Sequence, residues 1–294
     1  MQTVIVPWQT TAKRPKNPRP MALQRRDVDL FETINDFDGL LSEDQICRLF
    51  FGGGERACRY RMSKLWQNGY LHKPSRDQRA RIPAMIYWLD TPGAQEVANR
   101  HGLPLEQLNW VKRPRWGQVA HDLAVADFRI DVLIFTRRYP AFQIGAWYSE
   151  GVFRRWKDVV TFPTEKGVTK KRVTPDGYFE ILLNGKTFRL LFELDMATRD
   201  NPNFILEKAR PCLAYIKSDP YRERFGHNAG RVLVVTTSAL RLKYMKTRTE
   251  SALGKAASVF LFSTFELVNS DTVLTEPIWQ RGNENDPVPL FVSQ

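Results

Sequence analysis

Three acidic residues near the middle of the chain have the types and spacing of a metal-binding site. The segment from 175 to 195 reads PDGYFEILLNGKTFRLLFELD and carries Asp176, Glu193 and Asp195. Carboxylate oxygens are hard ligands that suit Mg²⁺ or Mn²⁺, and such an ion can activate a water molecule and stabilise charge on a phosphoryl group. These residues are therefore candidates for a metal-dependent catalytic site, provided that the fold brings them together.

The dipeptide Asn184-Gly185 predicts a hairpin that would bring them together. It is the strongest short-range hairpin signal, because a two-residue type I′ turn requires positive φ at both positions. A two-residue loop also fixes the register, and it places the opposite charges of Glu180 and Arg189 face to face. Counting outward on the same face sets Asp176 opposite Glu193, and the third carboxylate projects from that side two residues later.

Like charges placed opposite one another destabilise a hairpin unless something compensates for them. A divalent cation would compensate, and this is the functional interpretation of the acidic group. In the alternative interpretation one carboxyl is protonated or paired with an arginine, and the Pro-Asp-Gly sequence at 175–177 forms an ordinary turn. The pattern of residues leaves both interpretations open.

Residues 23 to 101 show the pattern of a winged helix-turn-helix domain. Three short helical segments are followed by a strand at 70–72, a basic loop, a strand at 85–89 and a further helix to about residue 100. In such a domain the third helix enters the major groove of double-stranded DNA. The candidates for DNA contact are the basic and aromatic residues of the third helix and of the loop: Arg56, Arg59, Tyr60, Arg61, Lys64, Lys73, Arg76, Arg79 and Arg81.

The charge of the chain supports a polyanionic partner. The 44 lysines and arginines exceed the 32 acidic residues by 12, and nine of the basic residues fall between positions 48 and 81. Two alternatives are a solvated basic face and a winged helix that contacts proteins. A membrane surface is not expected as a partner, because no amphipathic helix sets bulky apolar anchors against a basic face.

The remaining pattern predicts two domains and α/β structure overall. We expect a flexible basic arm at 1–22, the winged helix at 23–101, a linker at 102–117 and a restriction-endonuclease-like mixed-sheet domain at 118–294. In that last domain we expect a helix at 118–136, strands at 143–148, 231–236 and 259–263, a helix at 239–254, and partly irregular structure at 150–175.

The cysteines and the apolar segments predict a cytoplasmic protein. Cys47, Cys58 and Cys212 are few, odd in number and without C-x-x-C spacing, which favours free buried thiols in a reducing compartment. No run of about 18 to 20 apolar residues is available to cross a bilayer, and the first residues lack a signal-peptide pattern.

The order Pro175-Asp176, hairpin, Glu193-x-Asp195 and helix resembles the core of the PD-(D/E)xK nucleases. The resemblance implies that the aspartate and the glutamate bind a metal and that a lysine assists the attacking water. Asp195 stands where that pattern has its lysine. Some members of the fold carry the lysine on the following helix, which implies Lys208 as the substitute.

The whole arrangement is also similar to the replication-relaxation family of plasmid and mobile-element proteins. The matching pieces are the winged helix, HDLAVADFRI at 121–130, PDGYF at 175–179, FELDMAT at 192–198 and EPIW at 276–279. The resemblance implies a DNA-binding protein in replication or mobilisation, with partner proteins of those processes; the sequence leaves a homodimer open. Two hypotheses follow: a metal-dependent DNA endonuclease or nickase, or a non-catalytic DNA-binding regulator or replication factor with a degenerate nuclease-like domain.

Overall fold

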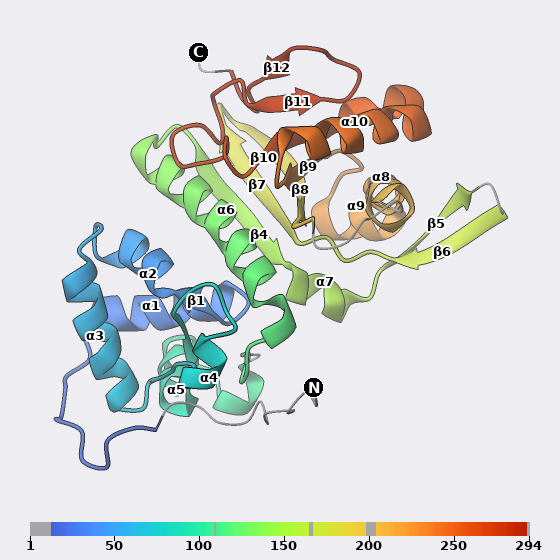
Figure 1. The fold of residues 1–294 in the computed structure, drawn as a ribbon. Helices are drawn as coiled ribbons and strands as arrows, with labels where there is room; N and C mark the ends of the chain where they lie inside the picture. Colours follow the sequence, from blue (N-terminus) through green and yellow to red (C-terminus); the bar gives the residue numbers. More distant parts are fainter. Residues whose placement is uncertain (1–12, 109, 165–166, 198–203, 293–294) are drawn as a thin grey trace, which may run out of the picture. The chain divides into compact units, whose positions relative to one another are not determined.

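The computed structural model describes residues 13–108, 110–164, 167–197 and 204–292. The chain forms two compact units, one up to Asp127 and one from Phe128 onward (Figure 1). The sequence predicts that the second domain begins at residue 118, but the division falls inside the long helix α6 (Val119–Arg138). Within the described ranges, no helix is long and apolar enough to cross a membrane.

The first unit has the order of elements that the sequence predicts for a winged helix. Its three short strands form an antiparallel sheet in the order β1-β3-β2. The short strand β1 and a helical turn inside the wing loop are additions to the predicted order. The elements are α1 (Arg25–Asp36), β1 (Leu41–Ser42), α2 (Glu43–Phe50), α3 (Glu55–Gln67), β2 (Leu71–His72), α4 (Arg76–Arg79), β3 (Ile86–Leu89), α5 (Thr91–Arg100), and the 3₁₀ turns η1 (Leu105–Gln107) and η2 (Trp116–Gln118).

Local sequence sets the ends of α2. The Ser42 hydroxyl accepts a hydrogen bond from the Gln45 N–H at 3.1 Å, and the Gln45 side chain accepts one from the Ser42 N–H at 2.9 Å, so the two residues form a capping box. After the helix, Gly52 and Gly53 take positive φ angles of 56° and 83°, which side chains with a Cβ rarely adopt. The tight turn that follows starts α3 directly.

The predicted basic arm is in part fixed to the first unit. Residues 1–12 of the arm lie outside the described residues, but Arg14 makes several defined contacts. Its guanidinium donates to the carbonyls of Trp66 at 2.8 Å and Leu71 at 2.7 Å and forms an ion pair with Asp90 at 2.6 Å. Around Arg14 the arm therefore makes defined contacts with the first unit, where a helix end and a strand offer carbonyl acceptors. The flexibility of the arm stays a prediction.

The second unit is built on a seven-stranded mixed sheet in the order β12-β11-β10-β9-β8-β7-β4. Strands β8, β9 and β10 run parallel, and the other pairs are antiparallel. A separate two-stranded ribbon, β5-β6, stands beside it. The elements after α6 are β4 (Gln143–Ser149), α7 (Glu150–Trp156), β5 (Val159–Thr164), β6 (Gly167–Arg172), β7 (Gly177–Leu183), β8 (Lys186–Asp195), the π-helical turn η3 (Ile205–Ala209), α8 (Arg210–Ile216), α9 (Asp219–Phe225), β9 (Arg231–Thr236), α10 (Ala239–Leu253), the 3₁₀ turn η4 (Gly254–Val259), β10 (Phe260–Thr264), β11 (Trp279–Arg281) and β12 (Pro287–Val288).

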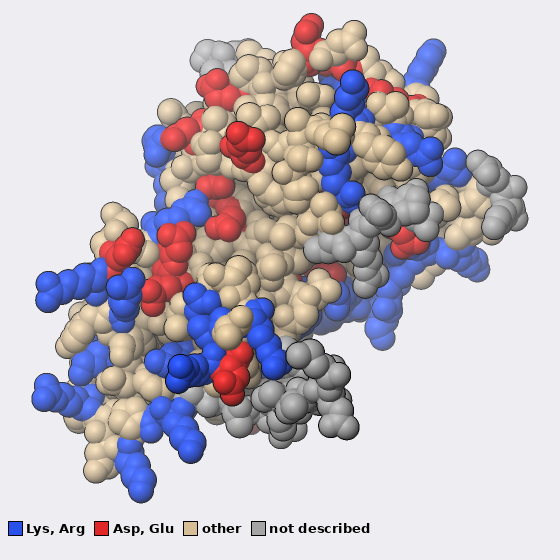
Figure 2. All heavy atoms as spheres, in the orientation of Figure 1, with Lys and Arg blue, Asp and Glu red and all other residues tan. Residues whose placement is uncertain are grey.

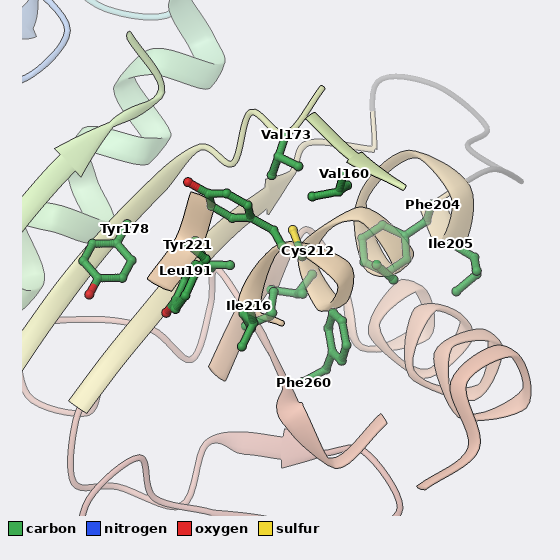
Figure 3. Packing of buried hydrophobic residues seen from close by; sticks show 14 of the residues in the cluster. Val160, Val173, Tyr178, Leu191, Phe204, Ile205, Cys212, Ile216, Tyr221 and Phe260 are labelled. Atoms are coloured by element: carbon green, nitrogen blue, oxygen red, sulfur yellow. The ribbon is translucent and has the colours of Figure 1, made fainter. Parts of the chain in front are cut away.

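The two faces of this sheet are covered by different helices (Figure 1). On one face, Phe128 of α6 stacks on Phe192 with ring centroids 4.0 Å apart. On the other face, Tyr178 and Leu191 join the apolar cluster that η3, α8, α9 and α10 build, with Cys212 in its middle (Figure 3). Side chains that alternate along β8 therefore point into two separate cores, and odd-numbered residues face the helices η3 to α10.

The hairpin register predicted from Asn184-Gly185 is confirmed. Both residues have positive φ, 51° and 71°, and β7 pairs with β8 so that Glu180 lies opposite Arg189. The stretch at 150–175, for which we expect partly irregular structure, is more regular than predicted, since most of its described residues form α7, β5 and β6. Its basic second strand lacks the apolar alternation that marks a strand in a sequence.

Candidate functional site

The structure brings two of the three predicted acidic residues together with the predicted lysine. Asp176 lies just before β7, Glu193 lies on β8, and Lys208 lies in the π-helical turn η3. The Lys208 Nζ is 2.5 Å from Glu193 Oε2 and 3.7 Å from Asp176 Oδ1. Both carboxylates are almost fully buried, whereas a third of the Lys208 side chain (33%) is exposed. The lysine thus forms the solvent side of this group, which we call the DEK cluster.

Fixed donors and acceptors hold the DEK cluster in place. The Leu194 N–H donates to Asp176 Oδ2 at 2.7 Å, and the Cys212 thiol donates to Glu193 Oε1 at 3.2 Å. The carbonyl of Thr174 accepts a hydrogen bond from Lys208 Nζ at 3.5 Å. The hairpin therefore supplies both carboxylates, and the helix that packs on it supplies the cation and the thiol.

Burial changes the proton affinities inside the DEK cluster. It raises the pKa of Glu193 to about 7, against the opposing effect of the Lys208 ammonium and with a further rise from Asp176. Burial alone would lower the pKa of Lys208, but the two carboxylates outweigh it and the pKa is raised. Burial also raises the pKa of the Cys212 thiol well above its ordinary value. Glu193 is consequently a carboxyl that exchanges its proton near neutral pH.

Asp195 lies outside the DEK cluster, although it projects from the face that the hairpin register predicts. The Arg241 guanidinium binds both of its oxygens, with Nη2 to Oδ1 at 2.9 Å and a second bond from Nε to Oδ2. The Thr236 hydroxyl donates to Oδ2 at 2.7 Å. Burial raises the pKa of Asp195, but the bonds from Arg241 outweigh this and the pKa is lowered. The arginine pairing that the sequence left open is thus the arrangement found for Asp195.

A divalent cation would have two protein carboxylates at this site. In the part of the chain that the structure describes, no group of three or more His, Cys, Asp or Glu side chains is arranged to hold a metal ion. Mg²⁺ commonly takes one or two carboxylates and completes its six positions with water and substrate phosphate oxygens. Asp176 and Glu193 meet that requirement, since their oxygens already converge on one positive charge, the ammonium of Lys208.

The predicted DNA-contact residues of α3 divide into an accessible group and one half-buried residue, Arg61, that is bound to α1. Arg56, Arg59 and Tyr60 are exposed, and Figure 2 shows basic side chains projecting over α3. The Arg59 guanidinium lies 3.1 Å from a Glu43 oxygen, and 65% of its side chain stays exposed. Lys64 Nζ lies 5.7 Å from the centre of the Tyr60 ring. These four residues form one accessible basic and aromatic face.

Arg61 turns away from that face. Its guanidinium donates to Asp27 Oδ1 at 2.9 Å, contacts Asp27 Oδ2, and donates to the carbonyl of Ala22 at 3.0 Å. The Asp27 side chain is 1% exposed. Arg61 therefore serves the packing of α1 on α3, and we leave it out of the proposed DNA-contact face.

The wing loop also contains residues of both kinds. Lys73 Nζ lies 3.6 Å above the Trp66 ring, and burial lowers the pKa of this ammonium. The Arg79 guanidinium donates to the carbonyl of Ile82 at 2.9 Å and so closes the loop. Arg76 and Arg81 are exposed at the loop surface. The exposed basic residues of the wing are thus fewer than the sequence predicts.

Two residues of the site were missed from the sequence. Cys212 follows Lys208 by four residues, the spacing that puts two side chains on one helix face, so its place beside Lys208 could have been predicted. Arg241 lies 46 residues after Asp195, and no local pattern links the two. Its contact depends on how α10 packs against the end of β8.

Comparison with known proteins identifies a family. A family model described as replication-relaxation covers residues 35–229, which is more than half of the chain and includes Asp176, Glu193 and Lys208. No curated protein and no solved structure shows significant similarity to the chain.

Proposed function

The chain belongs to the replication-relaxation family, and from this premise we propose that it is a metal-dependent DNA endonuclease or nickase of a plasmid or mobile element. Relaxation of closed, supercoiled DNA requires that at least one strand be cut. The DEK cluster is the group of residues best suited to such a cut. The winged helix would bind the double-stranded DNA, and the second unit would cut it.

One observation carries this proposal: a lysine from a separate helix lies 2.5 Å from one buried carboxylate and 3.7 Å from another. A structural ion pair needs one carboxylate for one ammonium. Here two carboxylates share a cation at a partly exposed position, so the site has negative charge in excess once Glu193 is ionised. Buried groups with such perturbed proton affinities concentrate at catalytic sites.

Each residue has a distinct role in the proposed reaction. Asp176 and Glu193 would hold the cation, which when bound polarises the scissile phosphoryl group and activates a water molecule. Lys208, at the solvent side, would place its ammonium beside the phosphate and stabilise the charge that develops there. The Leu194 N–H donates to Asp176 Oδ2 and so leaves the other oxygen of Asp176, Oδ1, directed toward Lys208. Cys212 orients Glu193 through the thiol hydrogen bond.

The test is the conversion of supercoiled plasmid to open circles by the full chain with Mg²⁺ or Mn²⁺. The variants are Glu193→Gln and Asp176→Asn, which keep the size of the side chain and an acceptor oxygen but remove the negative charge. We expect each to slow nicking by roughly a hundredfold or more, in line with the loss of one group that stabilises transition-state charge.

The matched control for both variants is Asp195→Asn, at the end of the strand that carries Glu193. It also replaces a carboxylate by an amide, but outside the DEK cluster, and should keep nicking. Plasmid that stays supercoiled with wild-type protein across both metals contradicts the proposal. So does nicking by Glu193→Gln at the wild-type rate.

A second candidate function is a non-catalytic DNA-binding replication factor. The observation that favours it concerns the position at which PD-(D/E)xK nucleases carry their lysine: Asp195 stands there and is bound by Arg241. Lys208 also neutralises part of the charge of the acidic pair. This candidate predicts that the wild-type protein retards plasmid DNA in a gel in a salt-dependent manner but never cuts it.

DNA binding is common to both candidates, and it rests on the exposed face formed by Arg56, Arg59, Tyr60 and Lys64. Because lysine and arginine release counterions when they neutralise phosphates, the affinity for duplex DNA should fall steeply with salt. A flat salt response would contradict DNA binding and with it both candidates.

A further inference from the structure

The β5-β6 hairpin is a ribbon outside the main sheet, and its two faces differ sharply in character. Val160 and Phe162 are 4% and 5% exposed and join the apolar core beneath α8. On the opposite face, Val159 and Val168 are 51% and 74% exposed. A two-stranded ribbon is at best marginally stable by itself, so the packing of its inner face accounts for its stability. The side chains of the outer face are not needed for that packing.

The register places two basic side chains on this outer face. Lys170 lies opposite Thr161, and Arg172 lies opposite Val159. Both basic residues are exposed and, being two positions apart on β6, they project from the same side of the ribbon. Short hydroxyl and β-branched side chains surround them, so a flat partner can reach both charges.

The surface next to the ribbon continues the positive charge. Arg154, Arg155 and Lys157 are exposed on or just after α7, and Figure 2 shows basic side chains gathered over α7 and the hairpin. Two acidic residues that the structure describes in this stretch are already bound. Glu150 accepts from Arg154 at 2.7 Å, and both oxygens of Asp158 accept from Arg224 at 2.6 and 2.7 Å.

The ribbon ends at the DEK cluster. Arg172 is followed by Val173, Thr174 and Pro175, and then by Asp176. The Thr174 carbonyl accepts from Lys208 Nζ at 3.5 Å. A chain of phosphates that lies along the outer face of the ribbon would therefore run toward the two carboxylates.

We infer that the β5-β6 hairpin is a second DNA-contact surface, at which Lys170 and Arg172 bind backbone phosphates of the duplex beside the DEK cluster. This inference rests on the proposed function, since it names the part of the second unit that holds the DNA substrate. Contacts of lysine and arginine to phosphate do not depend on base sequence, so this surface would hold a duplex of any sequence.

The test measures binding of a DNA duplex to the full chain as a function of salt, with Lys170→Gln/Arg172→Gln as the variant. The loss of two phosphate contacts should flatten the slope of log affinity against log salt by about two and weaken binding at 0.1 M salt roughly tenfold or more. The matched control, Lys243→Gln/Arg248→Gln, removes two exposed charges from α10 and should leave the slope near the wild-type value.

A lysine on a strand edge can instead serve to prevent pairing between strands of different molecules. The charge-reversal variant Lys170→Glu/Arg172→Glu separates the two roles, because glutamate also protects an edge but repels phosphate. We expect this variant to remain monodisperse in sedimentation and to bind DNA more weakly than the glutamine variant. Aggregation of the glutamine variant together with wild-type affinity in the glutamate variant would overturn the inference.

The outcomes keep the two proposals apart. If the wild-type chain fails to bind duplex DNA, the proposed function fails. If the wild-type chain binds and nicks DNA while both hairpin variants match the α10 control, the proposed function stands and the inference about the hairpin is wrong. Unchanged DNA binding by the hairpin variants is also the result expected if the hairpin binds an acidic protein instead of DNA.

Discussion

Each unit of the molecule contains a buried acid bound to a basic side chain, and the two pairs are built differently. In the first unit, Asp27 meets a planar guanidinium at both of its oxygens and also accepts the Gln24 N–H at 2.7 Å. In the second unit, the single ammonium of Lys208 faces two carboxylates. Both oxygens of Asp27 therefore have donors within the protein, whereas the DEK cluster has more negative than positive charge once Glu193 is ionised.

The difference separates an acid that is fully bound by its neighbours from one that can bind a further cation. An acid whose oxygens are all bound by fixed donors has little to offer to a ligand. An acid that shares its cation with a neighbour gains from a further positive charge. The same contrast occurs within β8. Arg241 binds both oxygens of Asp195, whereas Glu193, two residues earlier, shares the ammonium of Lys208 with Asp176.

The largest effect is expected from breaking the satisfied pair. Arg61→Ala leaves Asp27 buried with a charge and without its cation, which should lower the free energy of unfolding by about 3 kcal/mol. Urea denaturation followed by tryptophan fluorescence measures this loss. The control is Arg56→Ala at an exposed position of the same helix. Equal stability of the two variants would mean that Asp27-Arg61 is no more structural than a surface pair.

The DEK cluster should make the free energy of unfolding depend on pH. Because the pKa of Glu193 is raised from 4.5 to about 7 by folding, this carboxyl keeps its proton in the folded state while the unfolded chain loses it. Its contribution to stability is present below about pH 4.5 and is lost as the pH rises toward 7, by at most about 3 kcal/mol.

The check is the difference in unfolding free energy between wild type and Glu193→Gln across this pH range. The glutamine cannot ionise, so the difference should change with pH in favour of the variant. Parallel curves from pH 4.5 to 7 would show that Glu193 titrates normally and that the contrast with Asp27 is wrong.

A smaller effect is expected at Asp195, which resembles Asp27 in its bonding although it lies on the strand of Glu193. Asp195→Asn weakens the charge-assisted bonds from Arg241 and should cost about 1 to 2 kcal/mol of unfolding free energy. Since folding lowers the pKa of Asp195, this contribution is lost as the pH falls into the acid range. Thermal unfolding at pH 7 and at pH 3 compares the two conditions, and a stability loss that is larger at pH 3 would contradict the assignment.

The smallest effect on stability is expected at the exposed face of α3. Arg59→Ala removes an ion pair with Glu43 that water screens, so the unfolding transition should stay close to that of wild type. Affinity for duplex DNA should nevertheless fall severalfold, because one phosphate contact is lost. Titration of a labelled duplex gives the affinity, and an unchanged value would remove Arg59 from the DNA-contact face.

Local signals in the sequence predict much of the frame that carries the site. The Asn184-Gly185 turn allows only one short register, and the run at 231–236 is apolar and β-branched, so the residues alone are enough to place β7, β8 and β9. The placement of Asp176 near Glu193 follows from the same turn. The structure also sets Lys208 beside them, where the resemblance to nucleases implies it.

What the sequence could not supply depends on how distant elements pack. The partner of Asp195 comes from α10, and the partner of Arg61 comes from α1, 34 residues earlier. Spacing along a helix tells which residues share a face, but it does not tell which face meets a charge. The β5-β6 hairpin was missed for another reason, since its basic strand owes its pairing to the apolar residues of its neighbour.

The wide turn η3 that carries Lys208 makes the site sensitive to the length of the chain. A π-helical turn holds one residue more than the α-helical turn it replaces. Removing one residue between Lys208 and Cys212 would rotate Lys208 by about 100° relative to α8, and the ammonium would leave the carboxylates. A deletion of one codon at this point would therefore separate the cation from both acids and leave every side chain of the cluster present.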